Sequence, residues 1–239
     1  MKKGLVLLSL VLVAGSLVAL DISAGASSVV GSAWESYSLS GELLGMSVEG
    51  TEAHNWFTLG GKVFGDFTYG QAGVGYRVVS YGGGELTSTV DGDTTTDELD
   101  DTDAALHYIT FELLGKYPFD LGGVILAPVG GLAYDLCTAY YDADGEKVDP
   151  DDIYNYDGKK VGYSYFNNLR LVLGGAVDVP FGNLYVRTQG LFSLVLSQEY
   201  MKDYERLNKD LMEAYGGENV SSSSSFTALE ISVGIGYKF

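Results

Sequence analysis

The sequence predicts an all-β fold, in the form of an eight-stranded antiparallel up-and-down transmembrane β-barrel. Apolar and polar residues alternate along many segments, as they do in strands whose two faces meet different surroundings. The connections between these segments are alternately long and short, which is typical of a barrel with short periplasmic turns and long external loops. The 33 glycines and 18 tyrosines against 4 prolines also suit strands and tight turns better than helices.

The N-terminus has the pattern of an export signal. Two lysines precede an apolar run over residues 4–20, and small residues follow. This predicts a secretory signal peptide over residues 1–19, cleaved after Ala19, with cleavage after Ala26 as the alternative. A retained signal anchor is less favoured, because the run is near the lower length limit for a spanning helix. We therefore expect residues 20–239 to form one barrel domain.

The breaks in the alternation define the strands. Three breaks are short and contain the Gly, Asp, Asn or Pro of tight turns, at residues 64–67, 118–123 and 180–183. Four are long, at residues 37–54, 82–104, 139–162 and 199–225. The seven connections imply eight strands, at residues 20–36, 55–65, 67–81, 105–118, 122–138, 163–179, 184–198 and 226–239.

The two faces of these strands indicate which side meets lipid. Within 184–198, leucine, valine and phenylalanine alternate with residues such as Arg187 and Gln189. An arginine facing lipid at mid-depth costs roughly 2 to 4 kcal/mol, so we expect the charged face to line the lumen. The strand at 122–138 is less clear, because both of its faces are apolar and Asp135 alone indicates the interior.

Aromatic residues cluster near the ends of the expected strands, as in the two aromatic girdles of membrane barrels. With the signal peptide, the loop pattern and the C-terminal "SVGIGYKF", the chain resembles the small eight-stranded outer-membrane barrels typified by the OmpA transmembrane domain, OmpX and OmpW. The resemblance implies export through the periplasm to the outer membrane of a diderm bacterium, with outer-membrane lipid around the barrel. It also implies that Tyr237 and Phe239 form a signal read by the barrel-assembly machinery.

Ten charged residues are expected to face the lumen. An eight-stranded barrel is just wide enough for side chains to fill its interior, and buried charges of mixed sign pair with one another. We therefore expect a filled lumen, with a narrow channel for small solutes or ions as the alternative. The predicted charge network comprises Lys62, Arg77, Glu112, Lys116, Asp135, Arg170, Asp178, Arg187, Glu230 and Lys238.

The long connections are strongly acidic. Residues 82–104 contain eight acidic residues and no Lys or Arg. Oxygen-rich clusters suit Ca²⁺ or Mg²⁺, so divalent cations are candidate partners, and the weak ligand candidates are Asp142, Asp144 and Glu146. A solvated, mobile surface is favoured over a specific metal site. Residues 200–215 have helical spacing and predict an amphipathic helix over the barrel mouth, followed by a flexible serine-rich return. An exposed loop is also where an external ligand would bind.

Charge and composition exclude several functions. The net charge of −18 argues against a nucleic-acid partner, because phosphate contacts need clustered basic residues. His54 and His107 are both expected near the outer rim, but no nucleophile, base and orienting residue can be assembled around them. We therefore predict a non-enzymatic protein, structural or surface-interacting, that needs no cofactor. A lipid-modifying enzyme is the less favoured alternative, and a soluble lipocalin-like periplasmic barrel is the rival fold.

Overall fold

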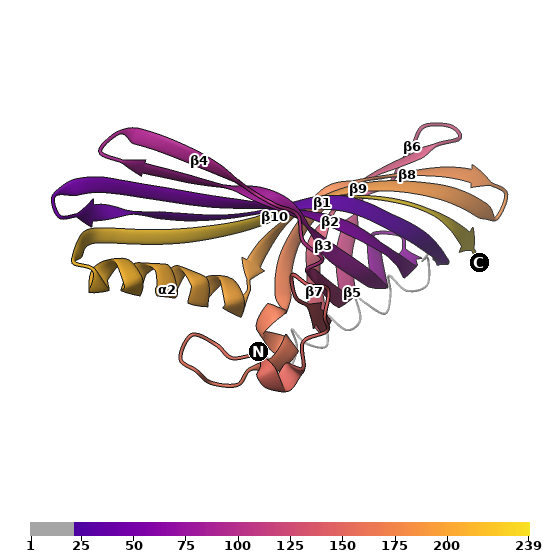
Figure 1. The fold of residues 1–239 in the computed structure, drawn as a ribbon. Helices are drawn as coiled ribbons and strands as arrows, with labels where there is room; N and C mark the ends of the chain where they lie inside the picture. Colours follow the sequence, from indigo (N-terminus) through magenta and orange to yellow (C-terminus); the bar gives the residue numbers. More distant parts are fainter. Residues whose placement is uncertain (1–21) are drawn as a thin grey trace, which may run out of the picture.

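The structure is a computed structural model that describes residues 22–239, so the predicted signal peptide at 1–19 lies outside the described residues. Within the described chain, ten strands form one antiparallel sheet (Figure 1). The pairing runs in the order β2, β1, β10, β9, β8, β7, β5, β3, and a further β2–β3 pairing closes the ring. The elements are β1 Ser23–Leu43, β2 Met46–Phe67, β3 Gly70–Val90, β4 Asp93–Leu99, β5 Ala105–Lys116, β6 Phe119–Asp120, β7 Ile125–Tyr141, η2 Pro150–Asp152, η3 Gly162–Phe166, β8 Asn168–Phe181, β9 Leu184–Ser197, α2 Glu199–Ala214 and β10 Gly217–Lys238.

The sheet therefore contains ten strands where the sequence predicted eight. The two extra strands are attached to one neighbour each: β4 lies in the long loop expected at residues 82–104, and β6 lies in the short turn expected at residues 118–123. β4 folds back on the end of β3, and β6 pairs with the first residues of β7. In each of these two connections, a short hairpin provides hydrogen-bond partners for the backbone groups. An irregular coil would leave the same groups to bond to water.

Three of the long loops expected from the sequence, at residues 37–54, 82–104 and 199–225, are wrong in part, because the strands continue into them. β3 runs to Val90, inside the second of these loops. β1 and β2 extend to a tight turn at Leu44–Gly45, where both residues have positive φ. The serines of residues 221–225, expected to be a flexible return, belong to β10 and pair with residues 36–40 of β1. The hydroxyls of Ser40 and Ser221 lie 2.9 Å apart across this pairing. β2 pairs with one edge of the extended part of β1. The backbone groups of its other edge would lack partners without the serine-rich segment, which forms hydrogen bonds with them.

The first short turn also differs from the expectation. Residues 64–67 are the last residues of β2, and the turn follows at Thr68–Tyr69. The third turn lies at Gly182–Asn183, within the expected range. The strand expected from residue 163 begins at Asn168, because residues 162–166 form η3. The later position of this turn does not alter which side chains face inward, because inward and outward side chains alternate along each strand with a period of two.

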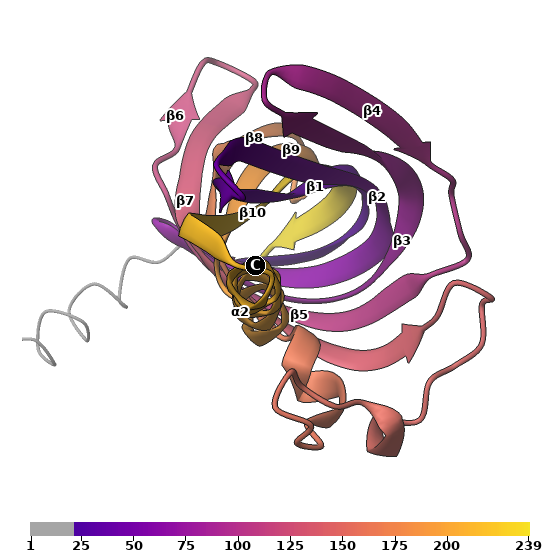
Figure 2. The same cartoon turned by 60° about the vertical axis from the view of Figure 1, so that its left-hand side comes forward.

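The amphipathic helix predicted at 200–215 is α2. Its buried residues are Met201 and Met212, and it lies along the extended part of β10 (Figure 1). Figure 2 shows the helix nearly end-on, next to β10. Among residues 22–239, no helix has the length and apolar character to cross a membrane. The helix instead lies at the loop end of the ring, on the side opposite the C-terminus (Figure 1).

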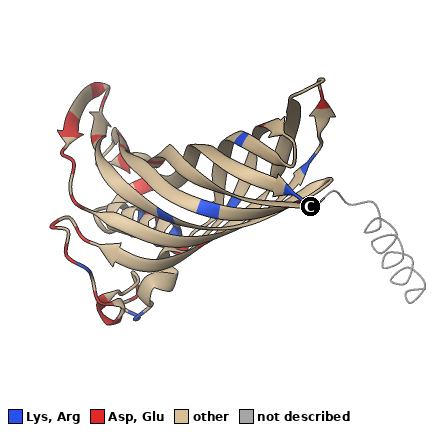
Figure 3. Ribbon diagram, turned by 90° about the vertical axis from the view of Figure 1, so that its right-hand side faces the viewer, with Lys and Arg blue, Asp and Glu red and all other residues tan. Residues whose placement is uncertain are grey.

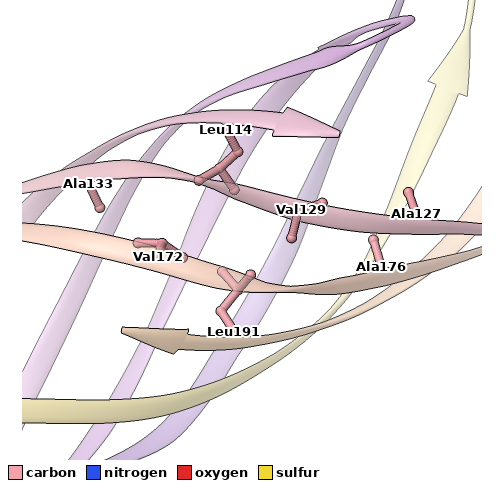
Figure 4. Packing of buried hydrophobic residues seen from close by; sticks show 7 residues of the cluster. All are labelled: Leu114, Ala127, Val129, Ala133, Val172, Ala176 and Leu191. Carbon is pink, nitrogen blue, oxygen red and sulfur yellow. The ribbon is translucent and has the colours of Figure 1, made fainter. Parts of the chain in front are cut away.

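The strands place charged residues inside and apolar residues outside. Along β10, Glu230 and Ser232 are buried, whereas Ile231, Val233 and Ile235 are 49–60% exposed. The apolar inner face of β7, which the sequence left ambiguous, contributes small residues to an internal cluster between β5, β7, β8 and β9 (Figure 4). That cluster consists of Leu114, Ala127, Val129, Ala133, Val172, Ala176 and Leu191. One side of the lumen is therefore lined by compact apolar residues, and the long charged side chains fill the remaining space.

Candidate functional site

The middle of the lumen holds a four-residue ion cluster contributed by four different strands. Arg77 of β3 contacts both Asp135 of β7 and Glu230 of β10. Arg170 of β8 reaches the same two acids, with its Nε 2.8 Å from Asp135 Oδ2 and its Nη1 3.3 Å from Glu230 Oε1. Arg170 also donates to Ser193 at 2.9 Å. The two arginines are thus matched by two carboxylates, which we call the central cluster.

An ion pair between Lys62 and Glu112 adjoins this cluster. Lys62 Nζ lies 2.7 Å from Glu112 Oε2 and donates to Gln189 Oε1 at 3.1 Å. Both charged side chains are more than nine-tenths buried. Because burying an unpaired charge is strongly unfavourable, this pair is stable in the interior only while both members are present.

A second network lies toward the short turns, and we call it the turn-side cluster. Arg187 binds Asp178 through two parallel contacts of 2.6 Å and also reaches Asp66 at 2.8 Å. Lys116 Nζ lies 3.1 Å from Asp66, and Tyr185 donates to the same carboxylate at 2.9 Å. Two cations again face two carboxylates, so this level of the lumen is also electrically balanced.

The space left between these side chains is small. A cavity of about 20 Å³ borders the central cluster and one of about 90 Å³ borders the turn-side cluster. A single water needs roughly 10 to 15 Å³ of such volume, so the first holds about one water and the second a handful. A larger solute could cross these levels only by separating paired buried charges.

The structure brings most of the predicted network together. Nine of its ten residues take part in the lumen ion pairs described above, and Lys238 borders the turn-side cavity without joining an ion pair among the described residues. Asp66 was not among the residues predicted from the sequence, because it was expected to lie in a turn. The signal was present: Asp66 follows Lys62 at an even spacing and therefore shares its face of the strand.

Above the central cluster, the barrel mouth contains an apolar cavity of about 250 Å³, which we call the mouth cavity. Strands β1 and β2 and the three longer loop-end connections contribute to its lining, and most of the lining residues are aromatic or aliphatic. Tyr108 separates the two levels, since it lines the cavity and its ring lies 5.3 Å from the guanidinium of Arg77. Besides Tyr108, the lining comprises Glu35, His54, Trp56, Val79, Tyr81, Thr102, Ala104, Leu106, Tyr140, Phe166, Gln198, Tyr200 and Phe226.

One carboxylate of the mouth cavity has no basic partner among the described residues. Glu35 is 5% exposed and accepts hydrogen bonds from the Tyr37 hydroxyl and, at 3.2 Å, from Trp56 Nε1. His54 lies opposite Glu35 in the β1–β2 register, but its Nε2 pairs with Glu52 at 3.2 Å. Glu35 was not among the residues predicted from the sequence, since it lies in a strand whose neighbouring residues do not indicate a cavity.

Glu52 connects the helix to the mouth. The Tyr204 hydroxyl of α2 donates to Glu52. Burial, the hydrogen bond to Glu52 and the charge of that carboxylate together raise the pKa of Tyr204 to about 12, so the hydroxyl keeps its proton at neutral pH. This contact holds α2 against the β1–β2 hairpin.

The two histidines lie on different sides of the barrel wall. His54 lines the mouth cavity, and its Nδ1 lies 3.2 Å from the Tyr81 hydroxyl. His107 contacts Tyr76, which is 48% exposed on the outer surface. The pair therefore does not converge on one site.

The loop-end connections carry most of the acidic residues, which gather at the end away from the C-terminus (Figure 3). Asp142 accepts backbone hydrogen bonds from Asp144 at 3.1 Å and from Glu146 at 2.9 Å, so its carboxylate closes its own turn. Within residues 22–239, no three His, Cys, Asp or Glu side chains meet in an arrangement that would hold a metal ion. Divalent cation binding stays a prediction.

The C-terminal residues close the ring. β10 pairs with β1 from Ser23 opposite Lys238, and the Phe239 amide donates to Ile22 at 3.1 Å. Tyr237 contacts Asn183 of the neighbouring turn at 3.2 Å, and its ring lies 5.3 Å from that of Phe239. The Phe239 side chain is 82% exposed, so it contributes little to packing within the barrel.

No protein-family model and no curated protein matches this sequence. The solved structures that are similar to the chain include the following three. The outer membrane protease OmpT of Escherichia coli has 10% identity and a TM-score of 0.32, over 92% of this chain and 97% of that one. The translocator domain of the autotransporter NalP of Neisseria meningitidis has 13% identity and a TM-score of 0.25, over 89% and 88%. The β domain of the Bordetella autotransporter BrkA has 16% identity and a TM-score of 0.20, over 88% and 100%. The predicted resemblance to OmpA, OmpX and OmpW stays a prediction.

Proposed function

We propose that this chain is a non-enzymatic integral β-barrel of a bacterial outer membrane, closed to solutes and active through its external loops. The eight strands of the ring cross the bilayer, while β4 and β6 lie outside it. The chain reaches this membrane by export through the periplasm, and the barrel-assembly machinery inserts it by reading Tyr237 and Phe239.

The reversed polarity of the barrel carries the proposal. A soluble lipocalin-like barrel keeps apolar residues inside and polar residues outside, whereas here the lumen contains two charge-balanced clusters and the outer wall is apolar. Outward positions such as Leu59, Leu113 and Ile235 are 59–71% exposed. Exposed apolar surface of this extent on a soluble protein would drive association, but it is what lipid requires.

The balanced charges support a closed lumen over a selective channel. Ion-selective pores present rings of one sign and an open path, but each level of this lumen pairs its cations with its own carboxylates. Passage of an ion would expose one partner of a buried pair, which is heavily penalised. We therefore assign the interaction function to the mouth and the loops.

The test is conductance of the purified, refolded chain in planar lipid bilayers, with membrane fractionation of the native protein. We expect recovery with the outer membrane and no discrete ion current. Stable current steps would replace the closed barrel with the narrow channel, and recovery in the soluble periplasmic fraction would overturn the membrane assignment.

A further inference from the structure

We propose that the mouth cavity binds a small organic cation, a protonated amine carried on an apolar or aromatic body. Nothing in the proposed function requires this site, and the inference holds whether or not the barrel conducts. It rests on three features of the cavity: a buried carboxylate with no basic partner, a buried acceptor with no donor, and an aromatic lining.

The first feature is Glu35. Its carboxylate is buried and receives only neutral donors, from Tyr37 and Trp56. The lining of the cavity includes no Lys or Arg, and His54 is engaged by Glu52. A buried carboxylate without a countercharge is strongly disfavoured, whereas the lumen carboxylates below all have cationic partners. A ligand cation would supply the missing charge.

The second feature is Gln198, the residue that precedes α2. Its side chain is more than nine-tenths buried and lines the mouth cavity. Its Oε1 has no hydrogen-bond partner, and it does not cap the helix that follows. A buried amide oxygen without a donor costs free energy, so the cavity presents a second acceptor that a ligand N–H would satisfy.

The third feature is the aromatic wall, which includes Trp56, Tyr81, Tyr140, Phe166 and Tyr200. The faces of aromatic rings attract cations and also accommodate an apolar body. Two acceptors and several ring faces favour a cation with N–H groups over an anion or a neutral apolar molecule. A quaternary ammonium would satisfy the rings but could not donate to Gln198.

Size and approach fit the same class of ligand. The cavity volume of about 250 Å³, against about 20 Å³ beside the central cluster, suits a small arylalkylamine. Thr102 and Ala104 of the cavity lining belong to the acidic connection at residues 82–104, and acidic residues gather at this end of the barrel (Figure 3), so their field would concentrate cations at the mouth. The central cluster beneath Tyr108 closes the lower side, so the ligand would enter and leave from the external end.

The experiment measures binding of 2-phenylethylamine to the refolded chain by tryptophan fluorescence. The sequence has two tryptophans, and Trp34 is 44% exposed on the outer wall. The substitution Trp34→Phe therefore leaves Trp56, which lines the cavity, as the only reporter. In this background we compare the amine with two isosteres, neutral 2-phenylethanol and anionic phenylacetate.

We expect saturable binding of the amine, weakened about tenfold or more by Glu35→Gln and several-fold by Gln198→Met. The matched control is Glu42→Gln, which removes an exposed carboxylate of the same strand and should leave binding unchanged. Unchanged affinity of Glu35→Gln for 2-phenylethanol shows that this variant retains the folded cavity. Equal affinity for all three isosteres, undiminished amine binding in Glu35→Gln, or the absence of saturable binding would each overturn the proposal.

Discussion

Replacing Arg170 with methionine is expected to destabilise the barrel more than any surface substitution. The Arg170 side chain is 1% exposed and contacts Asp135, Glu230 and Ser193. In Arg170→Met, only Arg77 remains to balance the two carboxylates of the central cluster. Methionine reaches only as far as the Nε of arginine, so the change keeps the apolar stem of the side chain and removes the guanidinium with its charge and hydrogen bonds.

The expected cost follows from that imbalance. Removing one partner of a buried ion pair typically costs about 3 to 5 kcal/mol, because the remaining charge is left uncompensated. We expect Arg170→Met to fall in this range. Adding Glu230→Gln removes the surplus carboxylate, so that one cation, Arg77, is again balanced by one carboxylate, Asp135. The double variant should therefore be more stable than the sum of the two single effects, by about 1 to 3 kcal/mol.

The measurement is urea unfolding of the refolded protein in lipid vesicles, with folded and unfolded forms separated by the gel mobility of unheated samples. Lys160→Met is the control, because Lys160 pairs with Asp151 at 2.9 Å on the surface, with 48% and 78% of these side chains exposed. An exposed pair of this kind contributes about 1 kcal/mol or less.

Two results would refute the reasoning. The first is a decrease of less than about 1 kcal/mol in the free energy of unfolding of Arg170→Met. So small a decrease would mean that Arg170 does not compensate a buried carboxylate. The second is simple additivity in the double variant, since the central cluster would then not act as a balanced unit.

Three further predictions concern the wall and the seam of the barrel. Deleting Phe239 should lower the amount of folded protein in outer-membrane fractions. It should change the free energy of unfolding little, because the Phe239 side chain is 82% exposed. An unchanged amount of folded protein would count against a role of Phe239 in assembly. Ile231→Arg should lower the free energy of unfolding in vesicles by about 2 to 4 kcal/mol relative to Ile231→Ala, because the outward side chain at this position would face lipid. Equal stability of the two variants would show that residue 231 does not face lipid. Gly236→Ala should cost about 1 to 3 kcal/mol, because the added Cβ would lie 2.1 Å from the Tyr185 ring. Gly190→Ala, where the Cβ meets nothing within 4 Å, is its matched control, and equal urea midpoints would contradict the packing argument.

Local patterns predicted the parts of this fold that depend on a single segment. The alternation in β8, β9 and β10 correctly separated buried from exposed faces, and the helical spacing at 200–215 correctly predicted α2. The serine-rich segment at 221–225 was assigned incorrectly, because serine has no strong preference for strands and its conformation depends on the neighbouring β1. The same limitation hid β4 and β6, which form only where a neighbouring strand offers its edge.

The sequence by itself determined which side chains point inward, because the side-chain period of a strand is a local property of the backbone. It could therefore place Arg77 and Glu230 in the lumen, but it could not show that they meet across 153 positions of the chain. Their contact depends on the stagger between strands in a closed sheet, which only the assembled ring defines. The mouth cavity depends on the tertiary structure still more strongly, since Glu35 and Gln198 come together only when the loop-end connections converge over the lumen.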